Sequence, residues 1–158
     1  MALKSFLATL FFSFIGVNIF MDSSEAKVNV KSEPAKYETA ILAGGCFWGV
    51  EDLIRAEKGV IKTVVGYTGG SDSTAKYELV KKGNTGHAES IKVTFDPSII
   101  SYKKLLLFFF TIHDPTTLNQ QGNDKGSQYR SEIFYLNDTQ KKEAEEIKAR
   151  VDKSKKWK

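Results

Sequence analysis

The chain has 158 residues, 41% of them hydrophobic, which is enough to build the core of one domain. Its net charge of +4 comes from 23 basic and 19 acidic residues, and the basic excess gathers near the C-terminus. No basic run is interleaved with aromatic residues, so we expect no nucleic-acid binding and interpret the basic end as a solvated helix face.

The N-terminal 26 residues have the pattern of a secretory signal peptide. Lys4 supplies a positive charge, residues 6–20 form an apolar run of 15, and small residues stand at Ser24 and Ala26. That run is short for a membrane span, which needs about 20 residues. We therefore expect a signal peptide over 1–26, cleavage after Ala26 and export, periplasmic or secreted. An uncleaved membrane anchor is the alternative.

Residues 27–37 are polar, contain a proline and are expected to be a linker. Beyond them, hydrophobic periodicity, glycine pairs and capping residues predict alternating strands and helices. The predicted strands are 39–45, 60–70, 87–96 and 128–136, and the predicted helices are 46–59, 101–113 and one that starts near Asn137. The polar loops between them, 71–86 and 114–127, are longer than typical connections, and such loops are usually functional.

The element order predicts the fold. Residues 38–136 read β-α-β-β-α-β, and residues 137–158 form a C-terminal amphipathic helix with a basic tail. This order is typical of the ferredoxin-like arrangement, an α+β two-layer sandwich in which two helices cover one face of an antiparallel-dominated sheet.

The only cysteine, Cys46, stands where the first predicted strand turns into the first predicted helix. Unpaired N–H groups and the dipole at a helix N-terminus favour an anion, so this thiol is predicted to be an exposed nucleophile. An unpaired cysteine in an exported chain also indicates a reactive thiol. One helical face cannot bury Phe47 and Trp48 together with Cys46, so at least one aromatic is expected to wall a small apolar pocket. A buried, inert thiol between core aromatics is the alternative.

Glu89 is the second informative residue. Odd positions of its predicted strand are apolar, and period two places Glu89 on that apolar face. A carboxyl group there must be paired or protonated, with Arg55 or a lysine stem as the side chain able to reach it. Burial would raise its pKa and make it a proton donor. A solvent-facing glutamate at the frayed start of the strand is the alternative.

The two histidines, His87 and His113, suggest one rival function. His87 shares the strand parity of Glu89, and a Cys46–His87 pair would fit a cysteine hydrolase. A zinc site is not indicated, since one cysteine and two histidines leave the ligand set short unless carboxylates join. No phosphate-binding or dinucleotide-binding loop appears, so no cofactor is indicated.

Six blocks in this order resemble one known family, the peptide methionine sulfoxide reductases of the A type, over a stretch from about Ala40 to Leu136. The blocks are "GGCFWG" (44–49), "GYTGG" (66–70), "NTGHAE" (84–89), "FDPSIISY" (95–102), "HDPT" (113–116) and "QGNDKGSQYRS" (121–131). The resemblance implies a catalytic core that reduces methionine S-sulfoxide, free or in proteins, and thereby repairs oxidised proteins.

Position by position, the resemblance implies a role for seven residues. Cys46 resembles the nucleophile, and Glu89 resembles the acid that protonates the sulfoxide oxygen. The tyrosines that hydrogen-bond the same oxygen correspond to Tyr77 and Tyr129. The substrate-binding residues correspond to Phe47 and Trp48, which wall the methyl group, and to Asp124, which alone would be interpreted as a turn residue. His87 then becomes a structural residue, or one that supports the site residues, and not a base.

This chain departs from the family in two respects. Members commonly carry further cysteines near the C-terminus that resolve the Cys sulfenic acid as a disulfide, and this sequence has none. The resemblance therefore implies an external thiol reductant, such as a thioredoxin-like protein, and no bound cofactor. Members also usually continue past the helix that here ends in "KSKKWK" (153–158), so the chain is C-terminally short. An inactive truncated fragment is thus an alternative to an active reductase.

The N-terminal pattern predicts that the mature protein begins near Lys27 and is found outside the cytoplasm. The intact mass of the protein from the exported fraction measures this directly, because removal of residues 1–26 shifts it by the mass of that segment. An intact Met1 in a membrane fraction would support the anchor instead.

Overall fold

The computed structural model describes residues 36–157. The predicted signal peptide lies outside the described residues, as does the predicted linker apart from its last two positions. Within the described range, no helix combines the length and the apolar character needed to cross a bilayer.

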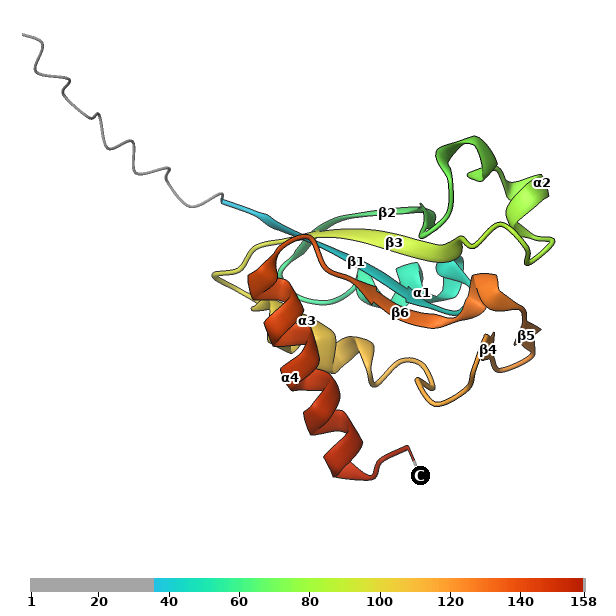
Figure 1. Ribbon diagram of the computed structural model, residues 1–158. Helices are drawn as coiled ribbons and strands as arrows, with labels where there is room; N and C mark the ends of the chain where they lie inside the picture. The colour runs from blue at the N-terminus through green and yellow to red at the C-terminus, as the bar shows by residue number, and fades with distance from the viewer. Residues whose placement is uncertain (1–35, 158) are drawn as a thin grey trace, which may run out of the picture. The chain divides into compact units, whose positions relative to one another are not determined.

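Four strands form the central sheet (Figure 1). They are β1 (Glu38–Gly44), β2 (Val60–Thr68), β3 (Ala88–Phe95) and β6 (Ser131–Phe134). Their order is β2-β3-β1-β6, and every neighbouring pair is antiparallel. This is the order expected of the ferredoxin-like arrangement, so the predicted fold class is confirmed.

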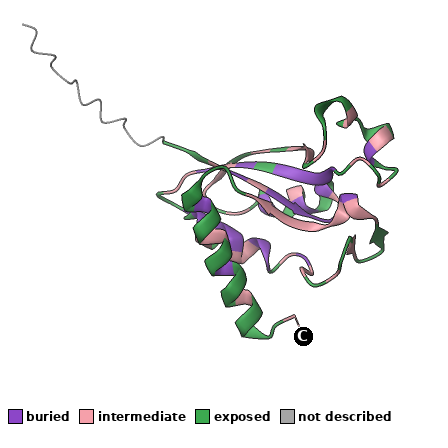
Figure 2. Ribbon diagram, viewed as in Figure 1, coloured by how far each residue is buried: buried purple, intermediate pink, exposed green. Residues whose placement is uncertain are grey.

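Helices α1 (Phe47–Ile54) and α3 (Tyr102–Phe109) pack on the same face of this sheet. Strand register explains the shared face, because Leu42 of β1 lies opposite Ile91 of β3 and both side chains belong to the buried cluster beneath the helices. Figure 2 shows the buried residues concentrated on β1 and β3 and on the inner sides of these helices.

The C-terminal helix α4 (Asp138–Ser154) packs against α3 and contributes Ile147 to the core (Figure 1). Its outer side is exposed along most of its length, as predicted for a solvated basic helix (Figure 2). The predicted cap is also present, since the Asn137 Oδ1 accepts a hydrogen bond of 2.9 Å from the Gln140 backbone N–H. The Gln140 Oε1 in turn accepts from the N–H of Leu136, one residue before the position expected in a capping box.

Two predicted helices are shorter than expected. The helix after Cys46 ends at Ile54, and the helix after Ser101 ends at Phe109. In each case the chain continues in tight turns, because the N–H of Glu57 bonds to the carbonyl of Ile54 and that of Ile112 to the carbonyl of Phe109.

The predictions for the last strand and for the two long loops are wrong in part. Residues 127–129 form a 3₁₀ turn, η2 (Ser127–Tyr129), so Tyr129 precedes β6 and does not lie on a strand. The loops contain four further short elements that the polar composition concealed. They are η1 (Asp72–Thr74), α2 (Tyr77–Val80), β4 (Gln120–Gln121) and β5 (Asp124–Lys125).

Gln140 ties α4 to the sheet, and we predict that Gln140→Ala destabilises the fold. The side chain is buried, and its Nε2 donates a hydrogen bond of 2.8 Å to the carbonyl of Thr39. Truncation would leave buried backbone groups without partners, at a cost of about 1–3 kcal/mol in the free energy of unfolding. Urea unfolding of the full chain measures this change in the free energy of unfolding. Glu145→Ala, an exposed change on the same helix, should stay within about 0.5 kcal/mol. An equally small effect of Gln140→Ala would contradict the prediction.

Candidate active site

Cys46 occupies the N-cap position of α1, directly after the turn that follows β1. Its thiol is free and partly accessible. Gly45 adopts a φ of +108°, and a β-carbon there would lie 2.6 Å from Cγ of Gln121. Only glycine fits this turn, which therefore delivers the thiol to the helix N-terminus as the sequence predicts.

Glu89 lies on the helix-covered face of β3 and is 5% exposed. Its Oε2 accepts a hydrogen bond of 3.1 Å from the backbone N–H of Phe47, the first residue of α1 after Cys46. The prediction of a buried position is confirmed, and the frayed-end alternative is wrong. The expected partner is also wrong, because Arg55 is exposed and pairs with Asp52. A backbone donor of the helix N-terminus contacts the carboxyl group in its place.

Burial raises the pKa of the Glu89 carboxyl above its ordinary value, and the negative charge of Asp124 raises it further. The hydrogen bond from the Phe47 N–H lowers it, since that bond favours the ionised form, but burial dominates. The group is consequently a better proton donor near neutral pH than an ordinary glutamate.

The two aromatic residues after Cys46 have different environments. Phe47 is buried, whereas Trp48 is 62% exposed. Their rings lie 5.3 Å apart between centroids and are tilted by 53°. Phe47 is thus part of the protein interior, and the alternative that both rings are core aromatics is wrong for Trp48. The wall of an apolar pocket beside the sulfur stays a prediction.

Tyr129 follows directly from the η2 turn and lies near the carboxyl groups. Burial raises the pKa of its hydroxyl, and the charges of Glu89 and Asp124 raise it further, whereas a hydrogen bond with Gln128 lowers it. Tyr129 is therefore within electrostatic reach of Glu89, Asp124 and Cys46, although Asp124 itself is exposed on β5.

Tyr67 is a member of this group that sequence reasoning missed. It lies opposite Glu89 in the β2–β3 register, and its ring centroid is 5.7 Å from that of Phe47. Burial raises the pKa of its hydroxyl, and Glu89, Tyr77 and Tyr129 raise it further. Pairing the two predicted strands as a hairpin would have placed Tyr67 on the face of Glu89. Tyr77, at the start of α2, is 50% exposed and belongs to the group through its proximity to Tyr67.

Both histidines are committed to structural hydrogen bonds. The His87 Nδ1 accepts from the N–H of Gly70 at 3.2 Å, and its Nε2 lies 3.0 Å from the carbonyl of Ser71, so the ring proton is on Nε2. The His113 Nδ1 donates to the carbonyl of Phe109, and its Nε2 accepts from the Ser131 hydroxyl. Burial lowers the pKa of His113. A hydrolase would need His87 as a base for Cys46, and both of its ring nitrogens are occupied.

Residues 36–157 contain no group of three or more His, Cys, Asp or Glu side chains placed to hold a metal ion. The arrangement combines a thiol at a helix N-terminus with an acid whose pKa is raised, and Tyr67, Tyr77 and Tyr129 belong to the same group of residues. Such groups support nucleophilic attack with proton donation.

Comparison with known proteins identifies the family. A family model described as peptide methionine sulfoxide reductase matches residues 38–158. The peptide methionine sulfoxide reductase MsrA of Pelagibacter ubique is 58% identical over 115 residues, 73% of this chain and 78% of that relative. The corresponding protein of Pseudomonas fluorescens is 55% identical over 120 residues, 76% of this chain but only 56% of that relative, so the chain spans little more than half of its length.

A solved structure agrees with these sequences. The crystal structure of Mxr1 from Saccharomyces cerevisiae in reduced form superposes with a TM-score of 0.73 at 39% identity, covering 80% of this chain and 75% of that one. The family model's match extends over the sheet, the helices and the residues around Cys46. The chain belongs to the peptide methionine sulfoxide reductase family, and within that family to the MsrA type.

Proposed function

We propose that this protein is a peptide-methionine (S)-S-oxide reductase, which reduces methionine S-sulfoxide, free or in proteins, to methionine. Family membership supports the reaction. The observation that carries its assignment to this chain is the contact that brings the buried Glu89 carboxyl within 3.1 Å of the Phe47 N–H, beside the Cys46 thiol. A nucleophile and a proton donor thus lie at one helix N-terminus.

In the first half-reaction the Cys46 sulfur acts as the nucleophile and Glu89 as the acid. The thiolate attacks the sulfoxide sulfur while Glu89 donates a proton to the sulfoxide oxygen. The attack forms a bond between the two sulfur atoms. The protonated oxygen then leaves the substrate sulfur and attaches to the Cys46 sulfur, and the sulfur–sulfur bond breaks to release the thioether and a Cys46 sulfenic acid. The substrate sulfur gains two electrons and becomes a thioether, and Cys46 loses two.

The surrounding residues bind and orient the substrate. The exposed ring of Trp48 lies beside the buried ring of Phe47 and offers an apolar contact for the methyl group. The hydroxyls of Tyr129 and Tyr77 hydrogen-bond the sulfoxide oxygen as it becomes more basic, and Asp124 contacts the polar end of the substrate. The raised pKa of Tyr129, caused first by burial, keeps its proton available for such a bond.

The second half-reaction needs an external thiol. Cys46 is the one cysteine among the 158 residues, so none of these residues can form a disulfide with it. Two thiols supplied by a thioredoxin-like protein or a small dithiol reduce the sulfenic acid to the thiol, releasing water and forming their own disulfide. A structure of yeast Mxr1 in complex with Trx2, which matches this chain at a TM-score of 0.56 and 31% identity, supports a reductant of the thioredoxin type.

The cellular role that we propose is repair of oxidised proteins under oxidative stress, in an exported location. Methionine sulfoxide is a common oxidative lesion, and the two epimers need separate enzymes. The N-terminal charge, apolar run and small residues support export through a cleaved signal peptide.

Cys46→Ser should abolish the activity, because no second thiol can replace it. We expect the wild-type full chain, given racemic methionine sulfoxide and dithiothreitol, to consume the S epimer alone, and the variant to consume neither. Without a reductant, one equivalent of substrate should leave a dimedone-reactive sulfenic acid on the wild type. Turnover by Cys46→Ser, or equal consumption of both epimers, would contradict the proposed function.

Glu89→Gln should slow the first half-reaction by about 10²–10⁴-fold with little change in KM, because the amide cannot donate the proton. The raised pKa of Glu89 also predicts the pH dependence. The wild-type single-turnover rate should include a decline as pH rises through that pKa, since the acid form is lost, and the variant should lack this decline.

The matched control is Glu51→Gln, which changes a different carboxyl group, on α1 and not on β3, and should leave the rate and the pH profile unchanged. If Glu89→Gln raised KM while kcat stayed intact, Glu89 would be a binding residue and not the acid.

A further inference from the structure

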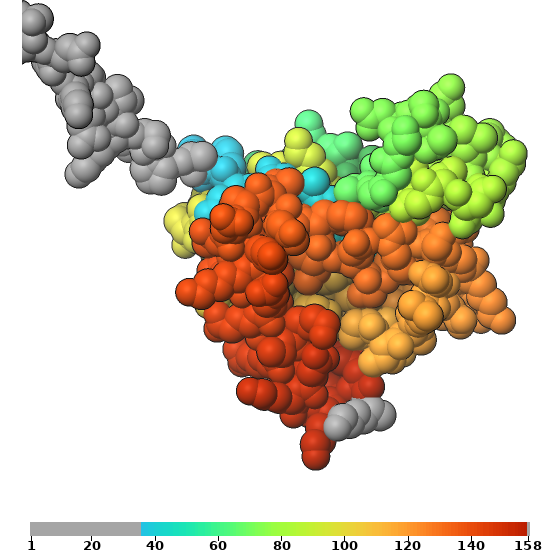
Figure 3. Space-filling model, viewed as in Figure 1, coloured from blue at the N-terminus to red at the C-terminus, as the bar shows by residue number. Residues whose placement is uncertain are grey.

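Side chains of residues 127–130 hold the loop between β2 and β3, which carries α2 and Tyr77. The two segments lie side by side on the molecular surface, although more than 40 residues separate them (Figure 3). Three side chains of one segment each donate to a backbone carbonyl of the other. The pairs are Ser127 Oγ to Gly83 at 2.8 Å, Gln128 Nε2 to Lys81 at 3.4 Å and Arg130 Nη2 to Gly86 at 3.1 Å.

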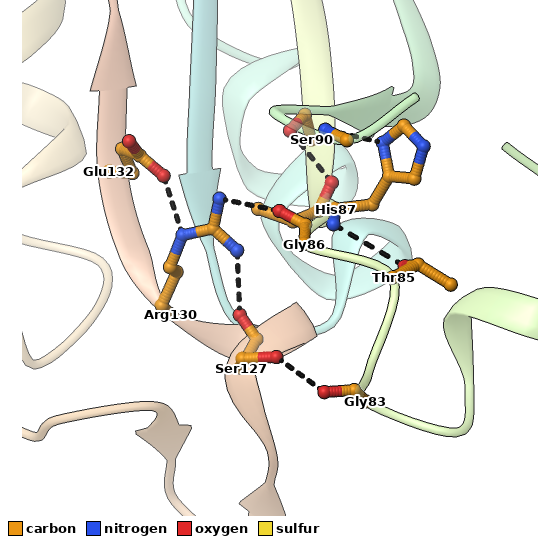
Figure 4. Close-up of polar contacts among 10 residues, drawn as sticks. Gly83, Thr85, Gly86, His87, Ser90, Ser127, Arg130 and Glu132 are labelled. Atoms are coloured by element: carbon orange, nitrogen blue, oxygen red, sulfur yellow. Dashed lines mark hydrogen bonds and ion pairs between the residues drawn. The ribbon is translucent and has the colours of Figure 1, made fainter. Parts of the chain in front are cut away.

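Arg130 makes three hydrogen bonds in this arrangement (Figure 4). Besides the bond to Gly86, its Nη1 donates to the carbonyl of Ser127 at 3.0 Å and its Nε to the Glu132 carboxylate at 2.5 Å. The side chain is 22% exposed, so these bonds are partly shielded from water. All three nitrogens of the guanidinium donate a hydrogen bond. The planar fork of arginine provides this geometry, and a lysine ammonium does not.

The guanidinium lies where the two ends of the loop come together. Gly86 stands at its C-terminal end, and Gly69 at its N-terminal end, where a β-carbon would lie 2.8 Å from the Arg130 Nη2. Close packing against Gly69 and a hydrogen bond to Gly86 therefore hold both ends of the loop at one point.

Tyr129 is the one residue of 127–130 whose side chain does not bond to this loop. Burial raises the pKa of its hydroxyl, and the charges of Glu89 and Asp124 raise it further. The segment thus binds the loop with Ser127, Gln128 and Arg130 and presents Tyr129 to the site.

We propose that Arg130 is a positioning residue for sulfoxide reduction. It fixes the turn that carries Tyr129 against the loop that carries Tyr77, and so sets the separation of the two hydroxyls that receive the sulfoxide oxygen. The inference rests on the proposed function. Arg130 acts through the two tyrosines, and its effect on the reaction should therefore depend on their presence.

The test compares Arg130→Met and Arg130→Lys with the wild type in the full chain, each alone and combined with Tyr129→Phe. Single-turnover reduction of methionine S-sulfoxide gives the rate, steady-state kinetics separate kcat from KM, and amide hydrogen exchange reports protection of residues 69–87. The matched control is Arg55→Met, which removes an exposed arginine whose ion pair within residues 36–157 is with Asp52 of α1 alone.

Arg130→Met should lower kcat by about tenfold to a hundredfold, the scale of a misplacement near 1 Å. Arg130→Lys should not restore it, because one ammonium cannot reach Gly86 and Ser127 together. In the Tyr129→Phe background, Arg130→Met should lower kcat much less. In the Arg130→Met variant, amide exchange of residues 69–87 should accelerate while β1 and β3 stay protected.

Equal losses in both backgrounds, full rescue by Arg130→Lys, or a loss of protection throughout the sheet would overturn the proposal, since each would show a general structural role. An inactive wild type would instead contradict the proposed function. In that case the exchange of residues 69–87 would still decide whether Arg130 holds the loop.

Discussion

The hydrogen bond between the Phe47 N–H and the Glu89 carboxyl is the contact around which the site is built. It joins the first turn of α1 to β3, elements that lie 42 residues apart in the sequence. The donor is one of the N–H groups that a helix leaves without an intrahelical partner, so the bond satisfies α1 and fixes Glu89 at once. Because Cys46 is the N-cap of the same helix, the bond also fixes the acid relative to the nucleophile.

Opposing effects act on this carboxyl group. Burial and the charge of Asp124 raise its pKa, the Phe47 N–H lowers it, and the balance favours the protonated form. Glu89 therefore binds its proton more tightly in the folded chain than in the unfolded one. Its ionisation lowers the free energy of unfolding, an effect that is absent below the ordinary pKa and complete above the raised one. A carboxyl group that weakens the fold at neutral pH is understandable at a position where a proton must be delivered.

Local patterns predicted the parts of the protein that depend on periodicity. The alternation of residues 87–96 placed Glu89 on the buried face, and the glycine turn before Cys46 placed the thiol at a helix N-terminus. The partner of Glu89 could not be predicted, because a backbone donor has no sequence signature. The 3₁₀ turn at Tyr129 and the helix at Tyr77 were missed for a related reason. Both are short segments in polar loops, held by long-range hydrogen bonds such as that from Arg130 to Gly86, so their conformation is decided by tertiary contacts.

Glu89 is thus a buried acid whose pKa is raised above its ordinary value and which lies at the same helix N-terminus as Cys46. The most direct measurement is an NMR titration of the Glu89 side-chain carboxyl carbon in the full, reduced chain, assigned by its loss in Glu89→Gln. We expect a midpoint clearly above the ordinary value for glutamate, about 4.3, and a lower midpoint when Asp124→Asn removes the neighbouring charge. A midpoint at or below the ordinary value would show that the Phe47 N–H outweighs burial, that Glu89 is ionised at neutral pH, and that the proton for the sulfoxide oxygen comes from another group.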